Sequence, residues 1–471
     1  MTQEQRPNVV TIVADDLGVW GMGCYGNPEI QTPNLDRLAT EGIRFDNFFC
    51  TSPVCSPARA SLLTGRIPSQ HGVHDWIRRG NLKEDPIEYL AGLTGFSEIL
   101  AEAGYDCAFS GKWHLGDSAT PQKGYSRWYT YQTGGGPYYN APVYRDGEAV
   151  REPGYVTDRI TDEALHFLEA QVAEAAPFHL AVHYTAPHSP WVNSHPPDIV
   201  ALYDDCPFDS CPQEPLHPWI LKNTVPEGVH EAPIEHLKGY FAAVTAMDAQ
   251  IGRLLEALEA AGVRENTIIF FTSDNGFNCG HHGIWGKGNG TYPLNMYDSS
   301  VKAPTILSLP EGEAAGTVCE ALLSHYDFMP TLLELLNLSL PEDETATLPG
   351  SSFLPVLRGE RAEARDEVVV YDEYGPVRMI RTHAWKYVHR YPYGPHELYD
   401  LQADPGERHN LVDDTPYAPM RETLKAKLDR WFLRYVDPDR DGSREPVYGK
   451  GQIGRCGTAG NGKQVFADDI R

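Results

Sequence analysis

Features that mark membrane-spanning or secreted proteins are missing from this sequence of 471 residues. No apolar run approaches the roughly 18 residues that a transmembrane helix needs, so no membrane span is expected. The N-terminal stretch MTQEQRPNVVTIVADD lacks a basic region followed by an apolar stretch, so no signal peptide is expected. Unless a leader has been trimmed away, this absence predicts a cytoplasmic location.

Positive charge is also scarce in the chain. The 39 Lys and Arg residues face 65 Asp and Glu residues, which gives a formal net charge of −26. This charge argues against nonspecific binding to nucleic acid or to anionic membranes. Any anion-binding site must therefore be locally positive, against the field of the whole chain.

Cysteines are few and irregularly placed. The nine cysteines have neither zinc-ribbon nor disulfide-framework spacing. Cys206 and Cys211 lie in a Pro-rich loop, where two unpaired thiols are favoured over a disulfide or a metal site. The composition is otherwise ordinary for a globular protein, with 41% hydrophobic and 22% charged residues.

Strand and helix signals alternate through the first 350 residues. Short β-branched apolar runs predict buried strands, and amphipathic stretches between them predict helices. This alternation predicts an α/β sandwich with a mainly parallel sheet, in which ligands bind at the carboxyl ends of the strands. The expected strands are 8–15, 106–114, 177–185 and 266–274, and the expected helices are 56–65, 95–105, 155–175 and 234–262.

The character of the chain changes near residue 350. Consecutive strands with short connections are expected, followed by a helix with an apolar stripe; these strands are 367–374, 377–391 and 396–401, and the helix is 420–436. We therefore expect two domains, a large one over residues 1–350 and a small α+β one over residues 351–471. The Gly-rich stretch 449–463 is expected either to cover another part of the protein or to be disordered.

Acidic side chains follow two of the expected strands directly. Asp15 and Asp16 end the first, and Asp274 with Asn275 ends the strand at 266–274. Hard oxygen ligands of this kind suit Ca²⁺ or Mg²⁺ rather than zinc. A helix cap or a turn is the alternative for one pair alone, but the two pairs together favour a metal site.

Basic side chains occupy the other strand ends and loops. Lys112 and His114 alternate to the same side of an extended chain, His188 follows the strand at 177–185, and Lys287 lies in a Gly-rich loop. Singly, each is more often a solvated side chain than a catalyst. Together with a metal and Arg59, they would bind a tetrahedral oxyanion, with imidazoles moving protons.

Cys55 begins an expected helix with Pro57 in its first turn, and Arg59 lies one turn on. The helix N-terminus adds partial positive charge and free N–H groups. An exposed, electron-rich cysteine is expected at such a position. The residue pattern leaves open a nucleophile, a metal ligand, a redox thiol of lowered pKa, or the precursor of another group.

The stretch CSPARASLLTGR at residues 55–66 matches the Cys-x-Pro-x-Arg signature of type I sulfatases, whose cysteine is oxidised to formylglycine. VADDLG, GKWHLG, APHSP and FTSDNG resemble the metal and Lys/His motifs of that family and occur in the family's order. The resemblance covers most of the chain. It implies an alkaline phosphatase-like α/β sandwich with a large mixed, mainly parallel sheet, plus a small C-terminal antiparallel sheet with a helix.

The resemblance also implies a metal site and a nucleophile. Asp15, Asp16, Asp274 and Asn275 bind a divalent ion, usually Ca²⁺ with Mg²⁺ as the alternative, together with the formylglycine made from Cys55. A formylglycine-generating or anaerobic sulfatase-maturing enzyme is the implied modifying partner. One hydroxyl of the aldehyde hydrate attacks sulfur, aided by Asp274, and the sulfated gem-diol later collapses by elimination.

The remaining motif residues then receive roles from the same resemblance. Arg59 steadies the formylglycine hydrate, and Lys112, Lys287 and His188 hold the sulfate group. His188 or Lys287 protonates the leaving alcohol. His114 takes a proton from the remaining hydroxyl, which expels sulfate and regenerates the aldehyde.

The loop GKGNGTYPLNMYDSSVKAP departs from the Thr-Tyr-Glu-Gly-Gly run common in the family. This difference weakens any inference of substrate contacts from other family members. Two alternatives remain: a phosphonate or phosphate ester hydrolase of the same superfamily, and a noncatalytic protein using Cys55 as a thiol. A zinc phosphatase would need more histidines near the Asp pairs, and GHHG at 280–283 is interpreted as loop structure lining the site.

The organic half of the substrate is less defined by the sequence. Aromatic and Arg side chains in loops near the motifs suit a sugar, so a small sulfated carbohydrate is favoured and an aryl sulfate is the alternative. Ordinary loop packing is the competing explanation for each of these side chains. The candidates are Trp76, Arg78, Arg79, Trp191, His195 and Trp219. No oligomeric state is predicted.

Overall fold

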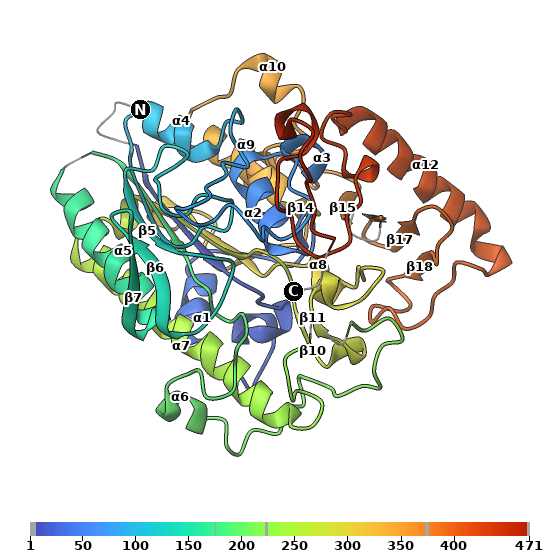
Figure 1. The fold of residues 1–471 in the computed structure, drawn as a ribbon, viewed down its shortest axis with the longest axis horizontal. Helices are drawn as coiled ribbons and strands as arrows, with labels where there is room; N and C mark the ends of the chain where they lie inside the picture. Colours follow the sequence, from blue (N-terminus) through green and yellow to red (C-terminus); the bar gives the residue numbers. More distant parts are fainter. Residues whose placement is uncertain (1–5, 175, 222–224, 373–375, 469–471) are drawn as a thin grey trace.

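A ten-stranded mixed sheet forms the centre of the protein (Figure 1), here described from a computed structural model over residues 6–174, 176–221, 225–372 and 376–468. Its central five strands run parallel, and antiparallel strands extend it at both edges. The strand order is β13 (Thr317–Cys319), β2 (Ile43–Phe45), β12 (Thr305–Ser308), β9 (Thr267–Ser273), β1 (Asn8–Ala14), β8 (Phe178–His183), β4 (Asp106–Lys112), β5 (Arg127–Tyr131), β6 (Tyr139–Arg145) and β7 (Glu148–Tyr155).

Helices cover both faces of this sheet, so its central strands are buried on both sides. All seven residues of β1 are buried. Val10 and Ile12 pack toward the layer of α1 (Pro33–Thr40), α5 (Val156–Ala173) and α7 (Pro233–Ala260). Val9 and Val13 pack toward α2 (Cys55–Thr64), α4 (Phe96–Glu102) and α9 (Phe328–Leu335). This alternation explains why β1 reads as a continuous apolar run.

Several shorter elements lie among these strands and helices along the chain. Two two-stranded pairs are formed by β3 (Phe48–Phe49) with β14 (Leu323–Ser324), and by β10 (Asn278–Cys279) with β11 (Trp285–Gly286). The short helices are α3 (Pro68–His71), α6 (Pro197–Ala201), α8 (Asp298–Val301), α10 (Glu342–Thr345) and α11 (Leu354–Leu357). Within the described ranges, no helix has the length and apolarity that crossing a bilayer requires.

A four-stranded antiparallel sheet and one helix follow near the C-terminus (right side of Figure 1). The strands are β15 (Val368–Asp372), β16 (Val377–Arg381), β17 (Trp385–Arg390) and β18 (Glu397–Asp400). Leu424, Leu428 and Phe432 of α12 (Ala418–Tyr435) form the apolar stripe that packs on this sheet. The predicted fold class is confirmed, whereas the domain boundary at residue 350 stays a prediction.

Most predicted elements are present. The single strand predicted over 377–391 is instead two antiparallel strands, β16 and β17, because the chain turns between Arg381 and Trp385. The strands β5–β7, and the strands β12, β2 and β13 on the other side of the sheet, are not predicted from the sequence, because they are short or lack a long apolar run. The predicted strand 106–114 ends at Lys112, so strand alternation does not set the position of His114. Residue 175 of the helix prediction and residues 373–374 of the strand prediction lie outside the described residues.

Gly111 allows β4 to approach β8 closely just before Lys112. Its φ is +123°, and a Cβ atom there would lie 1.8 Å from the carbonyl oxygen of His183. Gly111 is paired with His183 in the parallel register of the two strands. The absence of a side chain at residue 111 therefore sets where Lys112 leaves the sheet.

Replacing Gly111 with alanine is expected to destabilise the protein by about 3 kcal/mol or more, from backbone strain together with overpacking. Gly26→Ala is the matched control, because Gly26 has a φ of +96° but nothing within 4 Å of its added Cβ. The control should cost only about 1–2 kcal/mol. Urea-denaturation midpoints of both variants measure the difference, and equal midpoints would contradict the close approach.

Candidate active site

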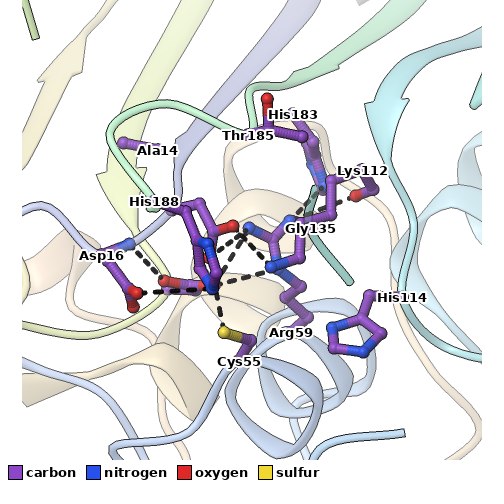
Figure 2. Close-up of polar contacts among 12 residues, drawn as sticks. Ala14, Asp16, Cys55, Arg59, Lys112, His114, Gly135, His183, Thr185 and His188 are labelled. Carbon is purple, nitrogen blue, oxygen red and sulfur yellow. Dashed lines mark hydrogen bonds and ion pairs between the residues drawn. The ribbon is translucent and has the colours of Figure 1, made fainter. Parts of the chain in front are cut away.

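The acidic residues of the site lie at the carboxyl ends of two neighbouring strands. Figure 2 shows one of them, Asp16, close to Cys55 and His188. Parallel β1 and β9 pair in a register that places Ala14 opposite Ser273. The residues that follow, Asp15 with Asp16 and Asp274 with Asn275, therefore leave the sheet side by side. The predicted adjacency of the two acidic pairs follows from this register.

The three carboxylates and Cys55 form one compact buried group. A ligand atom from each of Asp15, Asp16, Cys55 and Asp274 lies within 4.8 Å of the others. Asn275 Nδ2 donates to Asp16 Oδ1 at 2.8 Å, whereas the buried Asn275 Oδ1 has no hydrogen-bond partner among the described residues. Three carboxylates with one spare amide oxygen fit a hard divalent cation such as Ca²⁺ or Mg²⁺.

Cys55 begins α2 as predicted, but it is neither exposed nor electron-rich. Its exposed fraction is 4%, and burial together with Asp15 raises the pKa of its thiol. Its Sγ accepts a hydrogen bond from Lys287 Nζ at 2.6 Å and donates one to Asp15 Oδ1 at 3.4 Å. The expected lowering of this pKa by the helix start is therefore wrong, because desolvation among carboxylates outweighs the helix N-terminus.

Three buried cations pair with the three carboxylates. Lys112 Nζ lies 2.5 Å from Asp15 Oδ2, and Lys287 Nζ lies 2.6 Å from Asp16 Oδ1. Arg59 donates through Nε to Asp274 Oδ2 at 3.0 Å. Burial opposes ionisation of Asp15, but Lys112, His188 and Arg59 outweigh it and hold its pKa below the usual range. Desolvation likewise opposes the charge on Lys287, but Asp16, Cys55 and Asp274 raise its pKa well above the usual range.

The two predicted catalytic histidines occupy different surroundings. His188 Nε2 lies 3.8 Å from Asp16 Oδ2, and its side chain retains 28% exposure. His114 is buried and has a φ of +53°. Burial, Lys112 and Arg59 lower the pKa of His114 far below its usual range. A neutral imidazole therefore lies in the interior, and a partly solvated one lies at the edge of the site.

Several contacts at the site were not predicted from the sequence. His183 Nδ1 lies 3.5 Å from Arg59 NH1, at the end of β8 where a polar residue closes an apolar strand. The hydroxyl of Tyr138 donates to the backbone oxygen of His188 at 2.7 Å. Added Cβ atoms at Gly134 and Gly135 would lie 2.2 and 3.0 Å from the rings of His114 and His188. The run TGGGP was the available sequence signal for this close packing.

The substrate-pocket candidates divide by burial. Trp191 and His195 are 2% and 4% exposed and pack in the interior, so neither lines an open pocket. Trp191 packs on Tyr240 and Phe277. Arg79 is exposed, and the remaining candidates Trp76, Arg78 and Trp219 are partly buried. Ordinary packing was the competing explanation, and it holds for the two buried residues.

Other histidines and cysteines stay outside the acidic group. His281 Nε2 donates to the backbone oxygen of Ser210 at 2.9 Å, and His282 stacks on Tyr297 with ring centroids 3.8 Å apart. The group of side chains that could hold a metal among the described residues contains no histidine. All nine cysteines, Cys206 and Cys211 included, are unpaired in the described structure.

The buried carboxylates could bind a metal ion, and buried cations surround them at the edge of a mainly parallel sheet. Such an arrangement suits the hydrolysis of anionic esters. Comparison with known families gives the particular class. Residues 7–338 match the Sulfatase family, and residues 280–432 match the C-terminal family of N-sulphoglucosamine sulphohydrolase. The chain belongs to the sulfatase family and is a sulfuric ester hydrolase.

Relatives and solved structures extend this likeness over nearly the whole chain. An N-acetylglucosamine-6-O-sulfatase from Bacteroides thetaiotaomicron is 31% identical, covering 95% of this chain and 90% of the relative. Human arylsulfatase A is 30% identical, covering 90% and 88%. The solved structure of BT4656 in complex with its substrate D-glucosamine-2-N,6-O-disulfate has a TM-score of 0.77 at 28% identity, covering 92% of this chain and 99% of that one.

Substitution of Asn275 by alanine is expected to weaken binding of a divalent cation. Changing even an outer partner of a metal ligand costs about 10–100-fold in affinity, so losing a direct ligand should cost at least about tenfold. Calorimetric titration with Ca²⁺ measures this loss. Asn266→Ala, at an exposed asparagine, is the control. Equal Ca²⁺ affinities in the two variants would exclude Asn275 Oδ1 as a ligand.

Proposed function

We propose that the chain is a formylglycine-dependent sulfatase that binds Ca²⁺ and acts on a small sulfated carbohydrate. The observation that carries the proposal is the chemistry around residue 55. A neutral thiol of raised pKa, packed among three carboxylates, is a poor nucleophile. An aldehyde hydrate at the same position offers two hydroxyl oxygens and completes a set of hard oxygen ligands.

The metal would be held by Asp15, Asp16, Asp274, Asn275 and the modified residue 55. When bound, a Ca²⁺ ion supplies Lewis-acid stabilisation of oxygen atoms that gain negative charge. The formylglycine hydrate supplies one hydroxyl that accepts the sulfuryl group from the ester, and a second hydroxyl whose deprotonation releases sulfate. Water then restores the hydrate, so each cycle consumes one ester and one water and yields one alcohol and one sulfate.

Arg59 and Asp274 would prepare the nucleophile. Both nitrogens of Arg59 that face Asp274, Nε and NH2, lie 3.0 Å from its Oδ2. NH2 also lies 3.6 Å from Asp15 Oδ1. A guanidinium held between two carboxylates has a fixed direction, so Arg59 can orient the hydrate on the helix turn below it. Asp274 is the carboxylate available to accept the proton of the attacking hydroxyl.

Lys112, Lys287 and His188 would bind the sulfate group and protonate the leaving alcohol. Each of the two ammonium groups lies within 2.6 Å of a carboxylate of the site, so both can face oxygens of a bound anion next to those carboxylates. His188 alone of these three keeps substantial exposure, at 28% of its side chain. The alcohol must leave toward solvent, which favours His188 over Lys287 as its proton donor.

His114 is suited to remove the last proton. Its Nε2 lies 3.0 Å from the backbone oxygen of Ile77, an acceptor, so Nε2 carries the ring proton. Nδ1 therefore carries the lone pair, and this buried atom has no partner among the described residues. The lowered pKa keeps the ring neutral and able to accept a proton from the second hydroxyl.

A carbohydrate is favoured as the organic half of the substrate. The sulfatases named above include one for N-acetylglucosamine 6-O-sulfate, and one solved neighbour holds a sulfated glucosamine. Among the candidate side chains, Trp76 and Trp219 are aromatic and Arg78 is cationic, and none of the three is fully buried. Flat aromatic faces with adjacent donors suit sugar rings. An aryl sulfate is the second candidate, supported by the likeness to arylsulfatase A.

The mass of the tryptic peptide Phe45–Arg59 from protein made in its native host tests the modification. We expect residue 55 to have the mass of an aldehyde, while Cys50 in the same peptide stays a thiol and serves as the internal control. Cys55→Ala should remove all turnover of sulfate esters. An unmodified thiol at residue 55 in fully active protein would contradict the formylglycine mechanism.

The substrate class is tested with matched esters. Initial rates are measured on 6-sulfated N-acetylglucosamine, 6-sulfated N-acetylgalactosamine, an aryl sulfate and the corresponding aryl phosphonate monoester. We expect kcat/KM for at least one sugar sulfate to exceed that of the aryl sulfate by about tenfold or more, because hydrogen bonds to ring hydroxyls discriminate strongly. Failure on every sugar would favour the aryl sulfate, and faster phosphonate turnover would favour the phosphonate hydrolase.

A further inference from the structure

The last described part of the chain packs against residues 72–79. We call residues 449–467 the C-terminal strap; it is the dark red end of the chain beside α3 in Figure 1. Gln452, near the start of the strap, is completely buried and forms a parallel bridge with Ile77. Phe466 bridges back to Gln452 from the other side. The Gly-rich stretch therefore covers another segment, which is one of the two predicted alternatives.

Two successive peptide groups of residues 76–78 are bonded to the backbone of Gln452. The amide of Gln452 donates to Trp76 O at 2.8 Å, and its carbonyl accepts from Arg78 N at 2.9 Å. These contacts use the carbonyl of the Trp76–Ile77 peptide and the N–H of the Ile77–Arg78 peptide. Hydrogen bonds to the strap therefore fix the orientation of both peptide groups.

The opposite sides of the same two peptides face the active site. Ile77 N, in the first peptide, donates to Ser56 Oγ at 3.0 Å, next to Cys55 on α2. Ile77 O, in the second peptide, is 3.0 Å from His114 Nε2 and also accepts from Asn81 Nδ2 at 3.2 Å. A trans peptide is planar, with its N–H and C=O pointing in opposite directions. Fixing Arg78 N against the strap therefore fixes the direction of Ile77 O toward His114.

We propose that the C-terminal strap is part of the catalytic machinery and that Gln452 is a positioning residue, which holds the Ile77–Arg78 peptide so that its carbonyl orients His114. The inference rests on the proposed role of His114 as the base that releases sulfate. The strap itself touches no reacting atom. Its effect passes through one rigid peptide group rather than through a chain of flexible side chains.

The side chain of Gln452 anchors this arrangement. Its Oε1 accepts from His74 N at 2.9 Å, and its Nε2 donates to Gly72 O at 2.8 Å and to Gly454 O at 3.0 Å. The amide thus joins the end of α3, the segment that follows it, and the strap. Because both backbone groups on 72–74 are buried, loss of the amide leaves them without partners and frees the segment to shift.

A second contact of the strap supports the same docking. The carboxylate of Asp75 accepts from Gly451 N at 3.0 Å through Oδ2, and from Trp76 N at 2.8 Å through Oδ1. Arg78 NH1 donates to Lys450 O at 3.1 Å. The strap is therefore also held at the two residues before Gln452, and Trp76 and Arg78, two of the substrate-pocket candidates, are attached to it.

The test compares Gln452→Ala, and Gln452→Met in case the smaller residue fails to fold, with the control Gln464→Ala. Gln464 lies exposed in the same strap, and its side-chain amide donates to Phe466 O, within the strap. His114→Ala is the reference for loss of the base itself. Each protein is purified with residue 55 modified to the same extent, checked by the peptide mass, and its melting temperature is recorded.

In the Gln452 variants, kcat is expected to fall about ten- to hundredfold, the cost of misplacing a catalytic group by about 1 Å. Inhibition by inorganic sulfate should change by less than about twofold, because Lys112, Lys287 and His188 are untouched. Stopped-flow measurement should show a burst of alcohol followed by slow turnover, as in His114→Ala. Gln464→Ala should match the wild type. An unchanged kcat in the Gln452 variants would overturn the proposal. A fall in kcat accompanied by an equal weakening of sulfate inhibition would also overturn it.

A measurement without turnover separates this inference from the proposed function. The ¹⁵N shifts of His114, assigned with the His114→Ala variant, report which ring nitrogen carries the proton. We expect a single Nε2–H tautomer in the wild type and a mixture in Gln452→Ala. If no sulfate ester is turned over by the wild type, the proposed function fails, but the tautomer still decides the role of the strap. An unaltered tautomer in Gln452→Ala overturns that role.

Discussion

The burial of three carboxylates together with three cations is the constraint on which the site depends. A buried charge that loses its partner costs about 3–5 kcal/mol, so none of the six can be placed independently. The carboxylates come from the ends of β1 and β9. The cations come from α2, from the end of β4 and from the loop after β11, and they are Arg59, Lys112 and Lys287. Charge pairing thus ties one helix, one strand and one distant loop to a single geometry.

The backbone around these charges departs from regular structure in consequence. Asp16 has a φ of +67°, His114 one of +53°, and Gly111 one of +123°. Each lies at or just past the end of a central strand, where the chain must turn sharply to aim a side chain into the group. Left-handed backbone of this kind is costly for non-glycine residues and persists where the surroundings enforce it. Here the surroundings are the ion pairs and, for His114, the carbonyl of Ile77.

The local parts of the site were predictable, and the non-local parts were not. Asp15 and Asp274 each follow a β-branched apolar run directly, and parallel strands bring such ends to one edge of a sheet. Cys55 is buried next to Asp15 and Lys287, which are distant from it in the sequence. No sequence pattern near Cys55 indicates these contacts. Strands β6 and β7 expose many of their residues and carry no apolar signal. The contact of Gln452 with residues 72–78 joins segments from opposite ends of the chain and left no sequence signal.

The charge count of the site explains how a chain with a net charge of −26 can accept an anion. Three carboxylates and three cations cancel formally, so the buried group neither repels nor attracts on its own. With the proposed Ca²⁺ the site gains two positive charges, and a sulfate monoester, with one negative charge, leaves an excess of one. Transfer of the sulfuryl group builds negative charge on the leaving oxygen, which this excess stabilises in a site screened from water.

Inorganic sulfate, with two negative charges, restores neutrality, so the same balance that favours the transition state also predicts that the product binds well. The alcohol must then leave first, through the partly exposed side of the site at His188. Sulfate is released afterwards, when the free Nδ1 of His114 accepts the proton of the second hydroxyl.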